Sequence, residues 1–457
     1  MKDSINDIKV PVDYADRNIC ILGLGFVGLT LATVMADVGF QVTGIEIRDE
    51  LIDLIASGKA HFFEPGLSSK LQKVLSSKNL QVQKKLSPGD RSTVYIITAG
   101  TPLDENKNII LGNIKKISAD IAECLKDGDL VVLRSTVKLG TTRSIVLPIL
   151  QKSGKQFQIA FCPERTVEGQ AMAELRYLPQ IIGTDHLATG IRAAQLFQFI
   201  TPTVVRVNNL ETAEMIKLID NTKRDVIFGF SNEVAHLCDV AGLSADEVIN
   251  AGRFGYSRTD LPTPGPVGGP CLSKDSHILV QSMMEYGVVP EIIKAARNVN
   301  EEQSSIVVEF LKKFLSSLKD FPKKPIVSLL GIAFKGRPAT DDVRGSNAKC
   351  ILQDLKSALP EAQFWGYDPV VNPQVIQELG LDPKTTAEEA FQNASLVLIL
   401  NNHPFFSSMP IETWSLQMAR PGIIYDFWNN FKNENLYLPD DIQYIALGSH
   451  KYAKQTN

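Results

Sequence analysis

The chain has 457 residues, of which 44% are hydrophobic and 21% charged, and its formal net charge at pH 7 is −4. This length exceeds what one hydrophobic core can organise, so about two to four domains are expected. The mild charge gives no reason to expect a nucleic-acid partner or an anionic membrane surface, and no apolar run approaches the ~20 residues that span a bilayer.

The N-terminus and the cysteines indicate where the protein works. Residues 1–18 are polar and mixed in charge, without the apolar run of a signal peptide. The six cysteines are scattered, with no CxxC pair and no His–Cys cluster. This pattern predicts neither a disulfide framework nor a metal site, and it favours a reducing cytoplasm.

A glycine-rich turn between a strand and a helix opens the first predicted domain. Residues 19–22 form a short apolar run, and a helix pattern continues to about Val38, where Gly39 is a natural stop. The turn between them reads Gly23-Leu24-Gly25-Phe26-Val27-Gly28. Glycines at this spacing let the backbone approach a pyrophosphate, whose charge then lies at the helix N-terminus.

An acidic residue follows the next predicted strand, residues 41–45. It is Glu46, 18 residues beyond Gly28 (46 − 28), close to the ~20 typical of a dinucleotide site. Glu46 would accept hydrogen bonds from the adenosine ribose and repel a 2′-phosphate, which favours NAD. Arg48 leaves NADP open as an alternative, and a tight turn without a ligand is another.

Polar residues also follow three later apolar runs, at residues 94–97, 130–133 and 159–161. The residues concerned are Thr101, Thr136 and Glu164. The carboxyl ends of parallel strands meet at one edge of a doubly wound sheet, where ligands bind. We therefore expect these side chains to face a ligand, although each alone could be a helix cap.

Two long helices are predicted in the middle of the chain, at about residues 212–241 and 290–319. On the first of them, Lys217 and Asn221 are four residues apart and share one face. Such a pair is usually part of a solvated surface. The pair has a functional role only if this helix face lies against the loop of residues 264–275, which carries Cys271.

Between these helices, residues 264–275 form a glycine- and proline-rich loop that carries Cys271 and leads into another helix. Ser273 is the predicted N-cap, with Lys274 and Asp275 in the first turn. Helix N-termini and nearby cations lower the pKa of a thiol. Cys271 is therefore a candidate nucleophile, and a small buried apolar residue is the alternative interpretation.

A Lys/Pro-rich join at residues 321–325 precedes a second strand-and-helix series without GxGxxG. Its first loop carries Lys335 and Arg344, and basic residues there suit a phosphorylated ligand, with ordinary surface charge as the alternative. The predicted fold is α/β, with two Rossmann-like doubly wound parallel-sheet domains joined by a helical segment. The expected boundaries are 1–205, 206–320 and 321–457.

Taken together, these segments resemble the NAD-dependent nucleotide-sugar 6-dehydrogenases, the UDP-glucose/GDP-mannose dehydrogenase family, from about Ile19 to Phe427. The motifs that carry the resemblance are Gly23–Gly28, Glu64–Leu67, Ser135–Val137, Pro163-Glu164, Lys217 with Asn221, Gly265–Asp275 and Phe334–Arg344. The resemblance implies a four-electron oxidation of a sugar C6 alcohol to a carboxylate, with two NAD consumed.

The same resemblance assigns catalytic roles. Lys217 and Asp275 would hold a water and stabilise developing charge during the first oxidation. Cys271 would capture the aldehyde as a thiohemiacetal, and Glu164 would activate the water that hydrolyses the later thioester. Asn221 and Thr136 would orient substrate and water.

Family resemblance also implies that the nucleotide binds the C-terminal domain and that the central helices form a homodimer or a higher homo-oligomer. Arg258 would reach the neighbouring subunit's substrate, and Arg344 would serve the cofactor or the nucleotide. The full set of implied substrate contacts is Glu164, Arg165, Lys217, Asn221, Arg258, Gly268 and Lys335.

Two departures from the family pattern bear on the substrate. Arg165-Thr166 follow the glutamate where the UDP-glucose branch has Phe-Leu, and Gly345 follows Arg344 where a glutamate is common. The first departure resembles the UDP-N-acetylmannosamine branch, so UDP-ManNAc is the first expectation, before UDP-GlcNAc, UDP-GalNAc and UDP-glucose. A β-hydroxyacid dehydrogenase-like single oxidation and an inactive NAD-binding paralogue are the remote alternatives.

Overall fold

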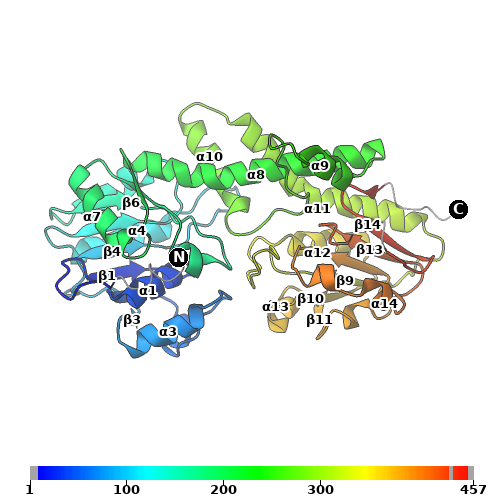
Figure 1. Ribbon diagram of the computed structural model, residues 1–457, viewed down its shortest axis with the longest axis horizontal. Helices are drawn as coiled ribbons and strands as arrows, with labels where there is room; N and C mark the ends of the chain where they lie inside the picture. The colour runs from blue at the N-terminus through cyan, green and yellow to red at the C-terminus, as the bar shows by residue number, and fades with distance from the viewer. Residues whose placement is uncertain (1–8, 432–435, 451–457) are drawn as a thin grey trace. The chain divides into compact units, whose positions relative to one another are not determined.

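The computed structural model describes residues 9–431 and 436–450 of the chain. They belong to two compact units, one made of residues 1–220 and 277–289 and the other of residues 221–276 and 290–457. Each unit contains one sheet flanked by helices (Figure 1). Within the described ranges, none of the helices has the length and hydropathy that a membrane crossing needs.

The first unit is built on an eight-stranded sheet with the order β3-β2-β1-β4-β5-β6-β7-β8. All neighbours in it are parallel except β6 and β7. The strands are β1 (Asn18–Leu22), β2 (Gln41–Ile45), β3 (Leu80–Gln83), β4 (Val94–Ile97), β5 (Leu130–Leu133), β6 (Gln158–Phe161), β7 (Gln180–Gly183) and β8 (Val204–Val207). The order reverses between β1 and β4, which is where a doubly wound sheet binds its ligands.

Helices cover both faces of this sheet, and its central strands are correspondingly apolar along their whole length. Every residue of β4 and β5 is buried, as expected of parallel strands that are shielded on both sides and therefore read as continuous apolar runs. The helices are α1 (Phe26–Val38), α2 (Asp49–Ala56), α3 (Leu67–Ser76), α4 (Gly112–Cys124), α5 (Leu147–Gln151), α6 (Ala171–Glu174) and α7 (Leu187–Gln198).

The second unit has a six-stranded parallel sheet with the order β11-β10-β9-β12-β13-β14. Its strands are β9 (Ile326–Leu330), β10 (Gln363–Tyr367), β11 (Asp382–Pro383), β12 (Leu396–Ile399), β13 (Gly422–Asp426) and β14 (Ile442–Ala446). Helices α9 (Ala245–Arg253), α11 (Glu291–Ser317), α12 (Asn347–Ala358), α13 (Pro373–Glu378) and α14 (Ile411–Ser415) belong to it. The predicted pair of Rossmann-like sheets is confirmed.

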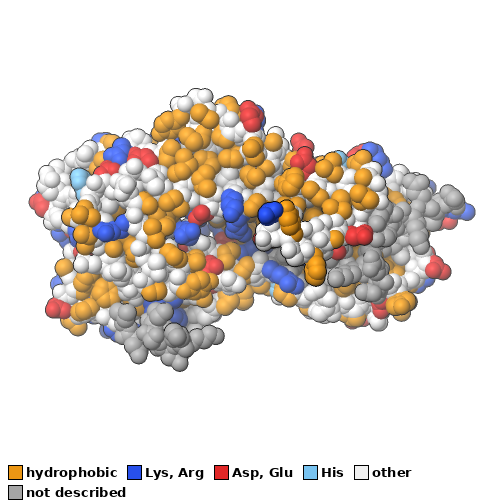
Figure 2. Space-filling model, turned by 45° about the horizontal axis from the view of Figure 1, so that its top comes forward, with side chains coloured by type: hydrophobic (Ala, Val, Ile, Leu, Met, Phe, Trp, Pro, Cys, Tyr) orange, Lys and Arg blue, Asp and Glu red, His pale blue; other side chains and the backbone are white. Residues whose placement is uncertain are grey.

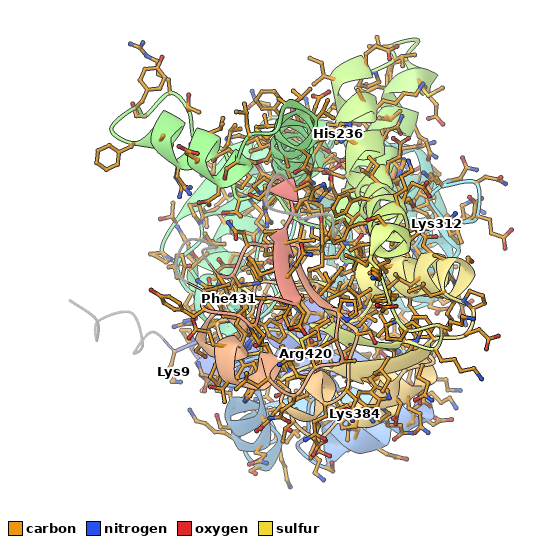
Figure 3. The ribbon with its side chains drawn as sticks, turned by 90° about the vertical axis from the view of Figure 1, so that its right-hand side faces the viewer. Lys9, His236, Lys312, Lys384, Arg420 and Phe431 are labelled. Atoms are coloured by element: carbon orange, nitrogen blue, oxygen red, sulfur yellow. The ribbon has the colours of Figure 1, made fainter. Side chains whose placement is uncertain are left out.

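The helical segment between the sheets contains two helices that pass from one unit to the other, α8 (Leu210–Ala241) and α10 (Leu272–Glu285). Apolar side chains gather over this helical part in Figure 2. In the second unit α8 packs closely on α11, because a Cβ on Gly229 would lie only 2.7 Å from the carbonyl oxygen of Ala296. Figure 3 shows the two helices by His236 on α8 and Lys312 on α11.

Candidate functional site

The glycine turn after β1 has the geometry of a pyrophosphate cradle. Gly23 has a φ of +100°, and a Cβ on Gly28 would lie 1.8 Å from the carbonyl oxygen of Gly23. Gly25 is the N-cap of α1, no side chain caps the helix there, and a Cβ at Gly25 would meet nothing within 4 Å. Open backbone N–H groups at a helix N-terminus suit an anion, so the turn fits a dinucleotide.

Glu46 lies at the end of β2, 5% exposed. Its Oε1 accepts hydrogen bonds from the Nε of Arg48 at 3.0 Å and from the backbone N–H groups of Ile47 at 3.1 Å and Arg48 at 3.2 Å. Burial alone would raise the pKa of Glu46, but these donors hold it below its usual range. Glu46 is therefore an anionic acceptor, and the Arg48 charge that could have served a 2′-phosphate is engaged by it. This arrangement favours NAD.

Substituting alanine at Gly28 should weaken NAD binding by at least about tenfold, since the new Cβ forces the turn open and moves the amides that face the pyrophosphate. Calorimetric titration with NAD measures the effect. Gly112→Ala is the matched control, because a Cβ there meets nothing within 4 Å. Wild-type affinity in Gly28→Ala would show that the turn does not hold the cofactor.

The polar residues at the carboxyl edge of the first sheet do come together in part. The hydroxyl of Thr101, which is buried, donates to the carbonyl oxygen of Thr136 at 2.6 Å. The loops that follow β4 and β5 are thus joined directly. The sequence predicted that Thr101 and Thr136 lie close together at this edge of the sheet, and the hydrogen bond between them confirms it.

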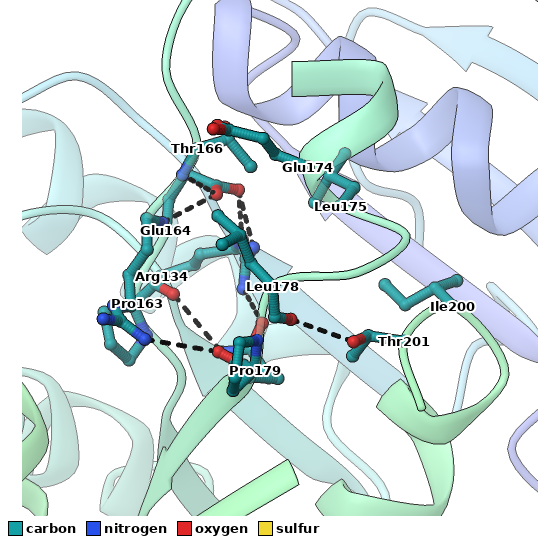
Figure 4. A pocket seen from close by; sticks show the side chains of 12 residues that line it. Arg134, Pro163, Glu164, Thr166, Glu174, Leu175, Leu178, Pro179, Ile200 and Thr201 are labelled. Carbon is teal, nitrogen blue, oxygen red and sulfur yellow. Dashed lines mark hydrogen bonds and ion pairs between the residues drawn. The ribbon is translucent and has the colours of Figure 1, made fainter. Parts of the chain in front are cut away.

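Glu164, after β6, is held as a carboxylate by donors on both oxygens (Figure 4). Oε2 accepts from the Nη2 of Arg134 at 2.6 Å and its Nε at 3.1 Å. Oε1 accepts from the backbone N–H groups of Arg165 at 2.7 Å and Thr166 at 2.8 Å. Burial would raise the pKa of Glu164, but Arg134, these hydrogen bonds and the nearby Lys217 together keep it below its usual range. Glu164 can therefore accept a proton or orient a water at neutral pH.

Arg134 is itself fixed in place. Its Nη1 donates to the carbonyl oxygen of Cys162 at 3.0 Å and to the Oε1 of Gln180 at 2.8 Å, and its guanidinium lies 5.5 Å from the ring centre of Phe197. Gln180 in turn donates to the carbonyl oxygen of Pro163 at 3.2 Å. Arg134, Pro163 and Gln180 are among the residues that line the pocket drawn in Figure 4.

The start of α8 is tied to the loop that carries Glu164. Arg165 donates from Nε to the Oδ2 of Asp220 at 2.8 Å. Lys217, one turn earlier on the helix, is buried, and so is Asn221. The interpretation of the Lys217–Asn221 face as a solvated surface is therefore wrong.

In the second unit, Asn221 holds the first turn of α10. Its Nδ2 donates to the Oδ2 of Asp275 at 2.6 Å, and Lys274 pairs with the Oδ1 of the same fully buried carboxylate at 2.6 Å. Cys271 precedes this turn and is exposed. Its carbonyl oxygen accepts from the backbone N–H of Asp275 at 2.9 Å, so Cys271 occupies the position at which the helix begins.

The prediction of Ser273 as the N-cap is wrong. Ser273 is already inside α10, and its hydroxyl donates to the carbonyl oxygen of Gly269 at 2.6 Å. The helix begins at Leu272, so Cys271 takes the N-cap position, two residues before the predicted one. Cys271 therefore lies closer to the helix N-terminus than the sequence suggested, at the place where an anionic sulfur is favoured.

The loop before Cys271 packs against the segment that follows β9. The N–H of Gly269 donates to the carbonyl oxygen of Gly345 at 2.9 Å, and a Cβ on Gly268 would lie 2.2 Å from that oxygen. Gly345 has a φ of +64°, a conformation that the glutamate common in the family would adopt with strain. The close contact with Gly268 and Gly269, together with the positive φ, therefore explains why this chain has glycine at position 345.

Three further predicted binding residues belong to the second unit, and each has a contact within its own loop. Arg344 is exposed and makes a two-pronged ion pair with Asp342, with Nη2 to Oδ2 at 2.6 Å. Lys335 lies with its Nζ 5.3 Å from the ring centre of Phe334. Arg258 is exposed, with its guanidinium 5.6 Å from the ring centre of Tyr256.

The residues that support the site were not predicted from the sequence. Arg134 directly follows an apolar strand, which was a signal for its place at the sheet edge, but nothing in the sequence paired it with Glu164. Among the described residues, no group of three or more His, Cys, Asp and Glu side chains is placed to hold a metal ion.

Comparisons with known proteins agree with this geometry. The chain matches the UDP-glucose/GDP-mannose dehydrogenase family in three parts: the NAD binding domain over residues 17–201, the central domain over 211–302 and the UDP binding domain over 328–433.

Individual relatives cover most of the chain. A UDP-N-acetyl-D-mannosamine dehydrogenase of Pyrococcus horikoshii is 32% identical over 91% of this chain and 96% of its own length. An NDP-N-acetyl-D-galactosaminuronic acid dehydrogenase of Ralstonia nicotianae is 30% identical over 88% of this chain and 94% of its own.

A solved structure of a UDP-D-ManNAc dehydrogenase from Pyrococcus horikoshii superposes with a TM-score of 0.84 at 30% identity, and the alignment covers 95% of this chain and 100% of that one. Family match, relatives, glycine turn and acidic strand end all agree. The chain belongs to the UDP-glucose/GDP-mannose dehydrogenase family and is an NAD-dependent nucleotide-sugar dehydrogenase.

Proposed function

We propose that the protein oxidises the C6 hydroxyl of a UDP-N-acetylhexosamine, UDP-ManNAc in the first place, to the carboxylate through a covalent intermediate on Cys271. The observation that carries this proposal is the exposed thiol at the start of α10. A single alcohol oxidation has no use for a nucleophile there, whereas capture of an aldehyde needs one.

In the first oxidation, a water held by Lys217 and Asp275 takes the proton of the C6 hydroxyl, and the ammonium stabilises the developing alkoxide. The Gly23–Gly28 turn and Glu46 would hold NAD, which would supply the hydride acceptor for each of the two oxidations. The hydrogen bond from Asn221 to Asp275 at 2.6 Å keeps that carboxylate in one orientation.

In the second half of the reaction, the Cys271 thiolate adds to the aldehyde carbon and forms a C–S bond. Oxidation of this thiohemiacetal, with loss of its hydroxyl proton, leaves a thioester. Water then attacks the thioester carbon, the C–S bond breaks, and the thiol and the uronate are released. Glu164 supports the last step because its carboxylate is ionised, and Thr136 orients the water.

The division of labour along the chain follows the three family domains. We assign NAD binding to residues 1–205, dimerisation and the central catalytic residues to 206–320, and the UDP-sugar to 321–457. Gly268, Lys335, Arg258 and Arg344 are the proposed contacts to the sugar nucleotide or, for Arg344, the cofactor. The six cysteines are scattered, without a CxxC pair, which suits a cytoplasmic enzyme.

The choice of UDP-ManNAc rests on the names of the relatives and on Arg165-Thr166 after the glutamate. Measuring kcat/KM with NAD for UDP-ManNAc, UDP-GlcNAc, UDP-GalNAc and UDP-glucose tests it. We expect the highest value for UDP-ManNAc, by at least about tenfold, which corresponds to ~1.4 kcal/mol of transition-state binding. A higher value for UDP-glucose would contradict the proposed sugar class.

We also propose that the enzyme is a homodimer through the central helices. In the second unit, α8 exposes Phe230, Leu237 and Val240, spaced by seven and three residues, and Phe254 after α9 is 90% exposed. The spacing of the three α8 residues puts them on one side of the helix, and exposed apolar side chains in such a group are of a kind that soluble monomers rarely show.

Light scattering after gel filtration tests the oligomer. We expect a mass of twice the 50.3 kDa chain for the wild type and a loss of dimer in Leu237→Asp, because a buried carboxylate opposes association. Lys312→Asp, on the exposed side of α11, is the control. A monomeric wild-type protein would contradict the proposal.

A further inference from the structure

A buried polar network adjoins the loop that carries Cys271, and no step of the proposed reaction uses it. Its members come from α8, α10 and α11, and each is at most 2% exposed: Asp225, Asn232, Ser276, Arg297 and Asn300. All five belong to the second unit. The hydrogen bonds among these side chains specify a single arrangement of the elements that they join. The Nε of Arg297 makes no hydrogen bond within the part of the chain that the structure describes, and it lies 3.6 Å from the Oε1 of Glu301.

Asp225 is the centre of the network. Its Oδ1 accepts from the Nη1 of Arg297 at 2.7 Å and from the Nδ2 of Asn300 at 2.8 Å. Its Oδ2 accepts from the hydroxyl of Ser276 at 2.7 Å. A buried carboxylate is tolerated only with such partners, so the three helices are held to one another at this point.

The network reaches the C-terminal end of the loop through Arg297. The same Nη1 that binds Asp225 also donates to the carbonyl oxygen of Leu272 at 3.0 Å. Leu272 is the residue after Cys271 and the first of α10. The guanidinium thus fixes the backbone next to the thiol.

The other end of the loop is fixed by Asn232. Its Oδ1 accepts from the N–H of Gly265 at 2.9 Å, and its Nδ2 donates to the carbonyl oxygen of Gly265 at 3.1 Å. Asn232 also donates to the Oδ1 of Asn300 at 2.9 Å, which connects it to Asp225. One network therefore anchors both ends of the segment from Gly265 to Leu272.

Ser276 gives α10 a second tie to α8. Asp275 accepts from Asn221, and the next residue, Ser276, donates to Asp225, one turn further along α8. These two neighbouring hydrogen bonds fix the rotation of the first turn of α10 about the helix axis, and with it the backbone of Cys271, which directly precedes the helix.

We propose that Asp225 and Arg297 are positioning residues that fix the place of Cys271, and that they determine whether the aldehyde is captured or released. This inference rests on the proposed function, in which Cys271 acts only after the first oxidation. Loosening the network should spare the first oxidation and slow the second, because a misplacement of about 1 Å at a reacting atom costs up to ~100-fold.

Ser276→Ala and Arg297→Lys test this role. Ser276→Ala removes only the hydrogen bond to Asp225 and leaves the Asp225–Arg297 pair intact, so we expect the variant to fold. Arg297→Lys keeps the positive charge but removes the guanidinium whose Nη1 binds both Asp225 and the carbonyl oxygen of Leu272. The matched control is Ser328→Ala, which removes another fully buried hydroxyl, one that donates to the carbonyl oxygen of Ala390 at 2.6 Å.

The readouts are the ratio of aldehyde, trapped with hydroxylamine, to uronate, and amide hydrogen exchange across residues 262–272. We expect both test variants to release at least about fivefold more aldehyde per uronate than wild type and control, with KM for the sugar unchanged within about twofold. Exchange in the loop should also be faster. Wild-type ratios and wild-type exchange in both variants would overturn the proposal.

Failure of the proposed function is distinguishable from failure of this inference. If wild-type enzyme makes no uronate, or Cys271→Ser makes it at the wild-type rate, the covalent mechanism fails. Loop exchange then decides the positioning role alone: faster exchange in Ser276→Ala than in Ser328→Ala supports it, and equal exchange overturns it.

Discussion

Replacing Cys271 by serine should lower the rate of uronate formation by about 10³-fold or more, since a hydroxyl is a far weaker nucleophile than a thiolate at neutral pH. Oxidation of the alcohol to the aldehyde does not require the thiol and should persist. Affinity for NAD should not change, because the glycine turn and Glu46 belong to the other unit.

The measurement is uronate and trapped aldehyde per unit time under saturating NAD. Cys350→Ser is the matched control, since Cys350 is the other exposed cysteine. The control should turn over as the wild type does. Uronate formation by Cys271→Ser at the wild-type rate would contradict a covalent role for the thiol.

Arg134→Met should lower the free energy of unfolding at pH 7 by about 3–5 kcal/mol, because it leaves the buried Glu164 carboxylate without its counter-ion. The two side chains are 1% and 8% exposed and lie 2.6 Å apart. Activity should fall as well, since Arg134 keeps the pKa of Glu164 low against the effect of burial.

Urea unfolding of the wild type and the variant measures the loss. Arg420→Met breaks an ion pair with Asp441 whose side chains are 45% and 42% exposed, and it should cost less than about 1 kcal/mol. A loss in Arg134→Met as small as that of the control would show that the buried pair does not stabilise the site.

The same pair predicts a dependence of stability on pH. The folded pKa of Glu164 is below the ordinary glutamate value of 4.5. Its contribution to stability is therefore complete above about pH 4.5, and it is lost as the pH falls through the folded pKa. In Arg134→Met this acid-side loss should shrink, which unfolding curves between about pH 3 and pH 7 would show.

Much of the fold could be predicted because buried parallel strands read as short, continuous apolar runs. Leu130–Leu133 is an example. Its observed bounds, and those of the partly polar strand Gln41–Ile45, agree with the sequence. The strands β7 and β8 were not predicted. Gln180–Gly183 begins with a glutamine whose side chain is buried by its bonds to Arg134, and Val204–Val207 is a half-exposed edge strand.

The site was predictable as a set of residue types but not as contacts. Lys217 and Asn221 could be placed on one helix face, yet their burial depends on the fold around that face. Ser273 was wrongly predicted as the N-cap because the N-cap preference depends only on residue type. The actual start of the helix depends on the backbone of the preceding loop. Asp225 and Arg297 are 72 residues apart (297 − 225), and nothing local in the sequence connects them.

A four-electron oxidation on a single enzyme consumes two NAD for each sugar, so the ratio of NADH formed to sugar consumed tests the proposed reaction. The experiment uses limiting UDP-ManNAc, or the best substrate of the panel, with excess NAD and wild-type protein. The proposed mechanism predicts two NADH and one uronate per sugar. One NADH per sugar, with aldehyde as the final product, would contradict it and remove the role assigned to Cys271.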